Sequence, residues 1–123
     1  MAIPGTTETN EQADPNVPVG MLRNVVDPLD SEFSSQELQT YTVPYVATIV
    51  NDKAQTYGTS KKEAIDRASQ HISEKAAECP GTKFGLTGFS QGADAAGDLA
   101  SKIGNGEGPV SADRIFAVGL MAD

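Results

Sequence analysis

The pentapeptide Gly88-Phe89-Ser90-Gln91-Gly92 constrains the fold of this chain more than any other feature of the sequence. It follows an apolar and β-branched segment, Lys83–Thr87, and opens an amphipathic one, so the serine is predicted to occupy a sharp strand-to-helix turn. Such a turn strains its central residue, and side chains two positions away on either side would collide where strand and helix approach each other. Both glycines are therefore needed for this turn.

Two segments have the apolar period of an amphipathic helix. In the first, Ser60-Lys61-Lys62-Glu63 has the spacing of a capping box, and Cys79-Pro80-Gly81 stops the helix. The second begins at about Gln91 and ends at Gly104. A shorter helical period starts at Val19, and Pro28 should end that helix near Val26 or Asp27.

Four segments are predicted to be strands: a stub at Ala2-Ile3-Pro4, Leu38–Tyr45 with Pro44 at its end, Lys83–Thr87, and Ile115–Met121. The last is almost continuously apolar, as in a strand covered on both faces of a parallel sheet. Strands that alternate with helices predict an α/β fold, and residues 1–123 form one domain. Loops are expected at Gly5–Asn16 and Gly104–Ser111.

Composition excludes several classes of function. The net charge is −8 and Lys and Arg do not cluster, which argues against nucleic-acid binding. No apolar run reaches the roughly 18 residues of a membrane span, and the N-terminus lacks the pattern of a signal peptide, so we expect a soluble chain. The single cysteine, Cys79, allows neither an internal disulfide nor a cysteine-ligated zinc site, so we predict a free thiol and expect no metal or cofactor.

The chemistry of the pentapeptide points to Ser90 as a nucleophile. Its hydroxyl would project from the turn at a helix N-terminus, where unpaired N–H groups and the helix dipole favour a developing negative charge. The backbone N–H of Gln91 points to that place. With 12 glycines in the chain, the bare pattern arises by chance with a probability on the order of 0.1, so its position between strand and helix carries the interpretation.

Several motifs, in the right order and spread over nearly the whole chain, resemble the cutinase family and the cutinase-like esterases of actinobacteria. These motifs are Ile3-Pro4-Gly5-Thr6-Thr7-Glu8-Thr9, Val19-Gly20-Met21-Leu22, Tyr41-Thr42-Val43-Pro44-Tyr45, Cys79-Pro80-Gly81-Thr82-Lys83, and Gly88 to Ala93, in which Phe89 replaces the family's Tyr. The resemblance implies a three-layer α/β-hydrolase fold, incomplete here, and a secreted or cell-envelope esterase. Its substrates would be lipid-like or polymeric esters.

By this resemblance Gln91 and Thr6 form the oxyanion hole. Gln91 would donate its backbone N–H, and Thr6 its backbone N–H, with the Thr6 hydroxyl as a further candidate donor. Thr6 could equally be an ordinary polar loop residue. The acyl-enzyme on Ser90 would be hydrolysed by water. A phage-type mycolyl esterase is a variant of this esterase hypothesis. Transfer of the acyl group to an alcohol would instead make the protein an acyltransferase.

The base and the carboxylate of a serine-hydrolase triad have no match in the sequence. In the family both follow the serine, but the only histidine, His71, precedes it in mid-helix, and we interpret it as structural or surface. None of the later carboxylates matches the catalytic Asp: Asp94, Asp98, Asp113 and Asp123. We therefore expect a domain cut at both ends, whose Asp and His lie on a complementary C-terminal segment. The alternative is a non-catalytic fragment or binding module that retains the elbow.

Overall fold

The computed structural model describes residues 1–49 and 56–122. Its strands β1 (Ala2–Ile3), β2 (Phe84–Phe89) and β3 (Ile115–Met121) form a parallel sheet in the order β1-β2-β3. The described helices are α1 (Arg23–Glu32), α2 (Tyr57–Glu78), α3 (Gln91–Gly104) and the 3₁₀ turns η1 (Gly20–Leu22) and η2 (Ala112–Arg114). The predicted α/β class is confirmed.

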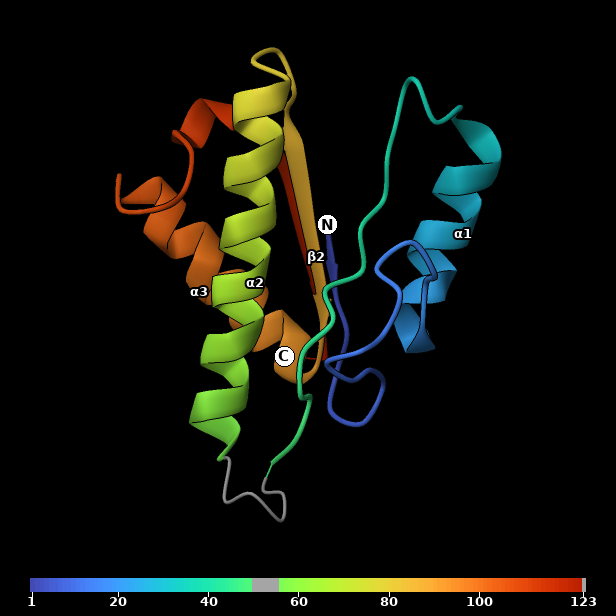
Figure 1. The fold of residues 1–123 in the computed structure, drawn as a ribbon, viewed down its shortest axis with the longest axis vertical. Coiled ribbons are helices and arrows are strands. Elements are labelled where there is room, and N and C mark those ends of the chain that lie inside the picture. Colours follow the sequence, from blue (N-terminus) through green and yellow to red (C-terminus); the bar gives the residue numbers. More distant parts are fainter. Residues whose placement is uncertain (50–55, 123) are drawn as a thin grey trace.

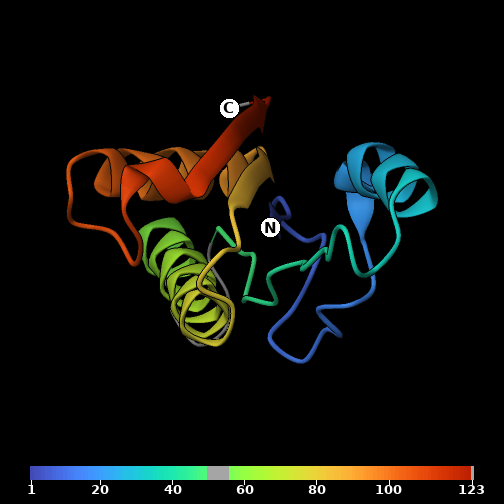
Figure 2. The same cartoon turned by 90° about the horizontal axis from the view of Figure 1, so that it is seen from above.

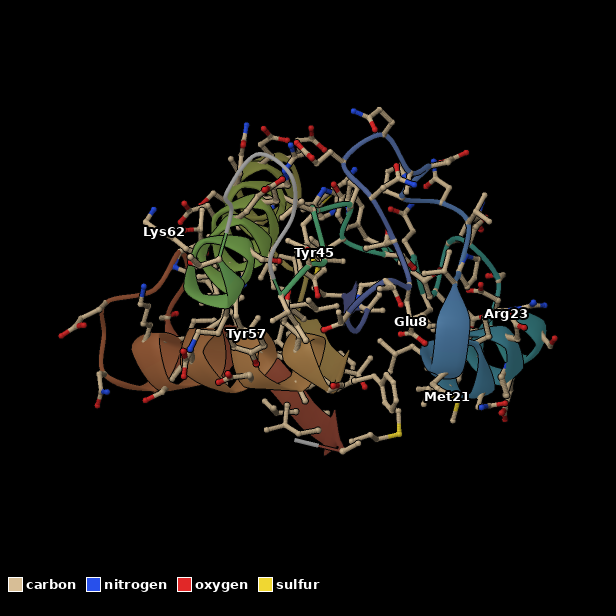
Figure 3. The ribbon with its side chains drawn as sticks, turned by 90° about the horizontal axis from the view of Figure 1, so that it is seen from below. Glu8, Met21, Arg23, Tyr45, Tyr57 and Lys62 are labelled. Atoms are coloured by element: carbon tan, nitrogen blue, oxygen red, sulfur yellow. The ribbon has the colours of Figure 1, made fainter. Side chains whose placement is uncertain are left out.

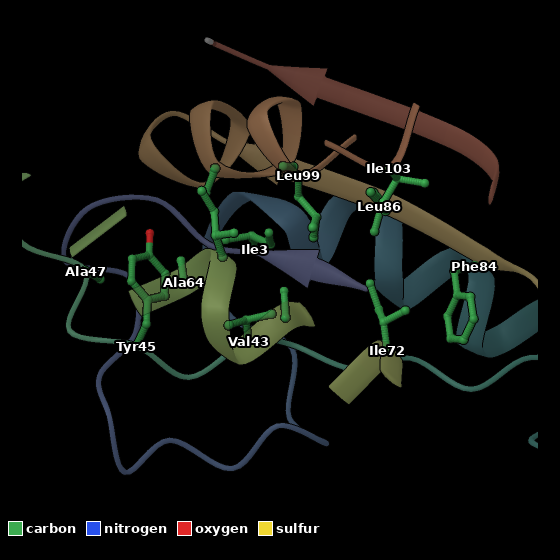
Figure 4. Packing of buried hydrophobic residues seen from close by; sticks show 14 residues of the cluster. Ile3, Val43, Tyr45, Ala47, Ala64, Ile72, Phe84, Leu86, Leu99 and Ile103 are labelled. Atoms are coloured by element: carbon green, nitrogen blue, oxygen red, sulfur yellow. The ribbon is translucent and has the colours of Figure 1, made fainter. Parts of the chain in front are cut away.

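The sheet separates two layers of helix. Helices α2 and α3 lie on one side of it and α1 on the other (Figures 1 and 2). The main core fills the space between the sheet and the α2–α3 layer, where Ile3, Leu86 and Leu99 meet (Figure 4). A smaller cluster of Ala2, Leu22 and Val26 joins α1 to the other face.

The predicted strand at Leu38–Tyr45 is wrong. The segment runs beside β1 and is buried from Thr42 to Tyr45, yet it forms only an isolated bridge between Thr42 and Ala2. The N–H of Ala2 donates to the Tyr41 carbonyl at 2.7 Å and the N–H of Val43 donates to the Ala2 carbonyl at 2.8 Å. After Ala2, the next residue of the N-terminal segment that faces this stretch is Pro4, which has no N–H to donate, so the ladder stops after one bridge.

Two predicted helix boundaries are also wrong. Helix α1 starts at Arg23, after η1, and continues past Pro28 to Glu32. Pro28 is exposed, so the carbonyl that lost its intrahelical partner is close to water and the helix tolerates it. Helix α2 starts at Tyr57, and the Thr56 hydroxyl caps it by accepting the Thr59 N–H at 3.2 Å. Ser60 is therefore a buried residue inside the helix and not its cap.

Strand β3 has the predicted bounds but not the predicted burial. Phe116, Val118 and Leu120 are 62%, 44% and 41% exposed. The reason is topological: in the described part of the chain β3 pairs only with β2, so its other edge and much of its surface face solvent. An apolar run can predict a strand, but the run does not encode which neighbours cover that strand.

Candidate active site

Ser90 lies at the sharp turn between β2 and α3 and has a left-handed backbone, with φ 54° and ψ −116°. Its N–H donates to the Met121 carbonyl at 2.9 Å, and its own carbonyl accepts the N–H groups of Ala93 at 2.9 Å and Asp94 at 3.1 Å. Strand β3 and helix α3 thus hold the strained turn in place through these hydrogen bonds. The prediction of a strained serine between strand and helix is confirmed, and Ser90 is partly exposed.

The two glycines of the pentapeptide mark backbone contacts that leave no room for a side chain. A Cβ on Gly88 would lie 2.2 Å from the Gly92 carbonyl oxygen, and a Cβ on Gly92 would lie 1.8 Å from the Ile3 carbonyl oxygen. The first contact closes the strand against the helix. The second presses the first turn of α3 against the end of β1, which brings the loop after β1 to the serine.

That loop reaches Ser90 through Gly5. A Cβ on Gly5 would lie 2.9 Å from the Phe89 carbonyl oxygen and 3.3 Å from the Ser90 Cβ, so Gly5 packs directly on the elbow. Thr6 follows and is partly buried. The fold therefore brings Thr6 and Gln91 together beside Ser90, from two segments that are far apart in the chain.

The carboxylate of Glu8 fixes the shape of this loop. Its Oε1 accepts the Gly5 N–H and its Oε2 accepts the Met21 N–H, each at 2.9 Å. Gly20, at φ +60°, leaves room for the carboxylate, since a Cβ there would lie 2.1 Å from Oε2. Glu8 thus ties the candidate oxyanion loop to the start of η1 (Figure 3). The sequence analysis did not predict this role, although Glu8 belongs to the motif Ile3–Thr9 that resembles the cutinase family.

Tyr45 anchors the same loop from the opposite side. Its hydroxyl donates to the Pro4 carbonyl at 2.5 Å, and Tyr45 is 0% exposed. Burial raises the pKa of Tyr45, so the phenol keeps its proton and remains a donor. The N–H of Thr7 also donates to the Ala47 carbonyl at 2.8 Å. Tyr45, at the end of the segment predicted as a strand, and Ala47 just after it therefore hold the loop through hydrogen bonds.

The side chain of Gln91 is buried, with 1% exposure, and bonds to three segments. Its Oε1 accepts the Ser60 hydroxyl at 2.6 Å, and its Nε2 donates to the Thr48 carbonyl at 3.0 Å and to the Thr6 Oγ1 at 3.4 Å. Ser60 is 0% exposed and its Oγ also accepts the Thr48 N–H at 3.1 Å. The sequence signal at Ser60 was interpreted as a helix cap, so this contact was missed.

His71 lies away from the elbow. Ser60 marks the end of α2 that meets Gln91, and His71 follows 11 residues later, roughly 16 Å further along the helix axis at 1.5 Å per residue. Its ring stacks on Tyr41, with centroids 3.5 Å apart and an interplanar angle of 15°. Burial, followed by the charge of Lys75, lowers the pKa of His71, which favours a neutral packing residue.

The carboxylates on α3 are engaged with α2. Asp94 accepts the Tyr57 hydroxyl at 2.8 Å and lies 3.5 Å from the Lys61 ammonium, which is 2.8 Å from Asp98 (Tyr57 is labelled in Figure 3). The hydrogen bond to Asp98 raises the pKa of Lys61 above its ordinary value. These contacts join the two helices and give Asp94 and Asp98 a structural role.

The described residues have three further features outside the elbow and its supporting contacts. A hollow of about 1240 Å³ lies between α1 and the sheet, and its apolar lining includes Val25, Leu29, Phe33 and Phe116. Among the helices of residues 1–49 and 56–122, none has the length and apolarity to cross a membrane. Cys79 is exposed, and it has no disulfide partner among the described residues.

Comparison with known proteins identifies the family. The chain is 34% identical over its whole length to a carboxylesterase Culp6 homolog of Corynebacterium glutamicum and covers 42% of that protein. It is 34% identical, over 80% of its length, to carboxylesterase Culp1 of Mycobacterium tuberculosis, of which it covers 41%. The chain thus spans less than half the length of these relatives.

Among solved structures, the catalytic core domain of acetyl xylan esterase from Trichoderma reesei has the same fold, with a TM-score of 0.71 at 20% identity. That match covers 100% of this chain and 63% of the esterase. The cutinase family model matches residues 5–123. The elbow, the fold and these matches together establish that the chain belongs to the cutinase family of carboxylesterase-related α/β hydrolases.

Proposed function

We propose that this chain carries the nucleophile and oxyanion hole of a serine carboxylesterase. The observation that carries the proposal is the left-handed backbone of Ser90 at φ 54°, held between the end of β2 and the first turn of α3. Ser90 Oγ attacks the carbonyl carbon of the ester and passes its proton to a base. The alcohol then leaves with a proton, and water hydrolyses the acyl group on Ser90.

The charge on the tetrahedral intermediate is stabilised by the N–H groups of Gln91 and Thr6. Support for Gln91 comes from its position as the first residue of α3, because the first N–H groups of a helix have no intrahelical partner. Support for Thr6 comes from the contact of the adjacent Gly5 with Ser90 and from the bonds that Glu8 makes to the loop. A preorganised donor of this kind is worth about 10²- to 10³-fold in rate.

The base and its orienting carboxylate come, in this proposal, from a complementary C-terminal segment that carries the Asp and the His. Within the described residues, the one histidine, His71, stacks on Tyr41, and Asp94 is bound by Tyr57 and Lys61. The exposed apolar side chains of β3 and the hollow between α1 and the sheet offer a surface on which such a segment would pack. The incomplete coverage of the longer relatives fits the same arrangement.

The substrate class follows from the family: an ester, which we propose to be lipid-like or polymeric. We place the whole protein outside the cytoplasm, secreted or in the cell envelope. Acyl transfer to an alcohol would use the same acyl-enzyme, and a mycolyl ester would be one lipid-like substrate. Competition between water and an added alcohol for the acyl-enzyme separates hydrolysis from transfer.

The test measures hydrolysis of a short-chain chromogenic ester by this chain, with and without imidazole as an external base. We expect slow hydrolysis that imidazole accelerates, because a missing general base removes about 10²- to 10⁴-fold of the rate. Ser90→Ala should abolish the accelerated reaction, while Ser101→Ala, on the exposed face of α3, should not change it. A longer chain that carries the Asp and His should need no imidazole.

A non-catalytic binding module that retains the elbow is the second candidate, and the observation that favours it is the lack of a base beside Ser90 within the described residues. The same experiment separates the two. If imidazole gives no Ser90-dependent reaction and the longer chain is also inactive, the binding module is correct. Rapid hydrolysis by the unsubstituted chain without imidazole would instead contradict the need for a complementary segment.

A further inference from the structure

One face of α3 carries two carboxylates towards α2, close to the elbow. Gln91, Asp94 and Asp98 share this face because they are spaced three and four residues apart. Asp94 accepts the Tyr57 hydroxyl at 2.8 Å. The Lys61 ammonium lies 3.5 Å from Asp94 and 2.8 Å from Asp98. One cation of α2 therefore contacts both carboxylates of α3.

Asp94 is the acidic residue of the first turn of α3, the turn that starts at Ser90. Its N–H donates to the Ser90 carbonyl at 3.1 Å, and four residues correspond to roughly 6 Å along a helix axis. The partial positive charge of a helix N-terminus attracts an acidic side chain in the first turn, and it equally attracts an anion bound at that end. The Asp94 carboxylate therefore stabilises the helix, but its charge repels the oxyanion that would form beside the Gln91 N–H.

The contacts from α2 offset the charge of Asp94. The side chains of Lys61 and Asp94 are 25% and 35% exposed, so water screens their attraction only in part. The hydrogen bond to Asp98 raises the pKa of Lys61, so the ammonium stays charged at neutral pH. The Tyr57 hydroxyl adds a hydrogen bond to the Asp94 carboxylate and adds no charge.

We propose that Lys61 and Tyr57 neutralise Asp94 and thereby keep the start of α3 favourable to the oxyanion. This inference rests on the proposed function and goes beyond the structural role of the contacts between the two helices. Lys61 acts through Asp94 and does not touch the substrate. The carboxylate at this position stabilises the fold and slows the reaction, and Lys61 limits that slowing.

The kinetic test follows phosphonylation of Ser90 by a fluorophosphonate, with imidazole added as the base. The Ser90 oxygen forms a bond to phosphorus, fluoride leaves with the electrons of the P–F bond, and imidazole takes the serine proton. The phosphoryl oxygen occupies the oxyanion hole. A unit charge about 8 Å away, at an effective dielectric constant of about 40, changes such a rate by about 5-fold.

Asp94→Asn separates the proposal from a purely structural role, because it removes the charge and keeps an oxygen that accepts the Tyr57 hydroxyl. We expect it to speed phosphonylation by about 5-fold at low ionic strength, while the Tm decreases by about 1–4 °C. A purely structural contact would make the variant both less stable and slower. Lys61→Met should slow the reaction by about 5-fold, and the two substitutions together should restore the original rate.

Asp98→Asn is the matched control, since Asp98 lies on the same face of α3 but one turn further from Ser90. It removes the shorter of the two contacts of Lys61, so a structural role predicts a larger effect for Asp98→Asn than for Asp94→Asn. The proposal predicts a smaller one. In 0.5 M salt, where the Debye length is about 4 Å, the effects of Asp94→Asn and Lys61→Met should fall below about 2-fold.

A thiol at the elbow measures the same electric field without a substrate. Ser90→Cys, combined with Cys79→Ser, gives a single thiol whose pKa is measured from thiolate absorbance. Asp94→Asn should lower this pKa by about 0.7, and Lys61→Met should raise it by about 0.7, because a thiolate at a helix N-terminus responds to nearby charge.

The two measurements keep the inference and the proposed function apart. A thiol pKa that Asp94→Asn leaves unchanged or raises overturns the inference, and so does slower phosphonylation of Asp94→Asn. No labelling of the unsubstituted chain would count against the proposed function, and the thiol pKa would then decide the inference alone. Either substitution gives the sign of the effect, so Lys61→Met decides it if Asp94→Asn does not fold.

Discussion

Substitution of Gly92 by alanine tests whether the elbow and β1 form one closely packed unit. The new Cβ would lie 1.8 Å from the Ile3 carbonyl oxygen and 2.5 Å from the Pro4 carbonyl oxygen. Since ordinary contact starts at 3.4 Å, the end of β1 would have to move by about 1.6 Å. Ile3 is 0% exposed and pairs with Gly88 in the sheet, so this movement would disturb the core and the strand pairing together.

The expected loss of stability can be built from two opposing terms. Overpacking costs about 1–3 kcal/mol and more where backbone must move, and we take about 4 kcal/mol here. Alanine recovers about 1 kcal/mol over glycine inside a helix. The net effect is a decrease of about 3 kcal/mol in the free energy of unfolding, which corresponds to a decrease of about 10 °C in Tm for a domain of this size.

Urea unfolding followed by circular dichroism measures this difference. Gly104→Ala is the matched control, because Gly104 belongs to the same helix and a Cβ there meets nothing within 4 Å. We expect Gly104→Ala to be neutral or stabilising by up to about 1 kcal/mol. If Gly92→Ala unfolds within about 0.5 kcal/mol of the unsubstituted chain, the contact between the elbow and β1 does not constrain the fold as argued.

The pH dependence of stability tests the role of His71. Burial lowers the pKa of His71, so the unfolded chain binds the proton more readily and stability decreases as the pH falls below about 6.5, the ordinary value. His71→Phe keeps a ring beside Tyr41, so it should show a smaller decrease in Tm between pH 8 and pH 5. It should also leave the slow reaction of Ser90 without imidazole unchanged. A loss of that reaction, restored by added imidazole, would make His71 the base. Cys79 should react with a thiol reagent in the native chain at one equivalent, since it is exposed and unpaired. Titration of no thiol in the monomer would contradict this, and Cys79→Ser is the control.

The local parts of the site could be predicted because neighbouring residues encode them. A strand, two glycines and a helix start specify the turn at Ser90, and the observed φ of 54° follows from those few positions. Helix α3 and the bounds of β3 likewise follow from short apolar periods. The segment Leu38–Tyr45 has a strand-like composition, but pairing needs donors on a neighbour, and after Ala2 the neighbouring segment continues with Pro4, which has no N–H.

The supports of the site depend on contacts that no local pattern encodes. Glu8 meets Met21 across 13 positions, Tyr45 meets Pro4 across 41, and Ser60 meets Gln91 across 31. Ser60 looked like a helix cap because capping spacing is a local signal, while its burial against α3 is a consequence of helix packing. The sequence by itself determined the strained serine, because backbone strain is set by adjacent residues. Only the tertiary structure decided what holds Thr6 beside it, because hydrogen bonds between distant segments exist only after the sheet has brought them together.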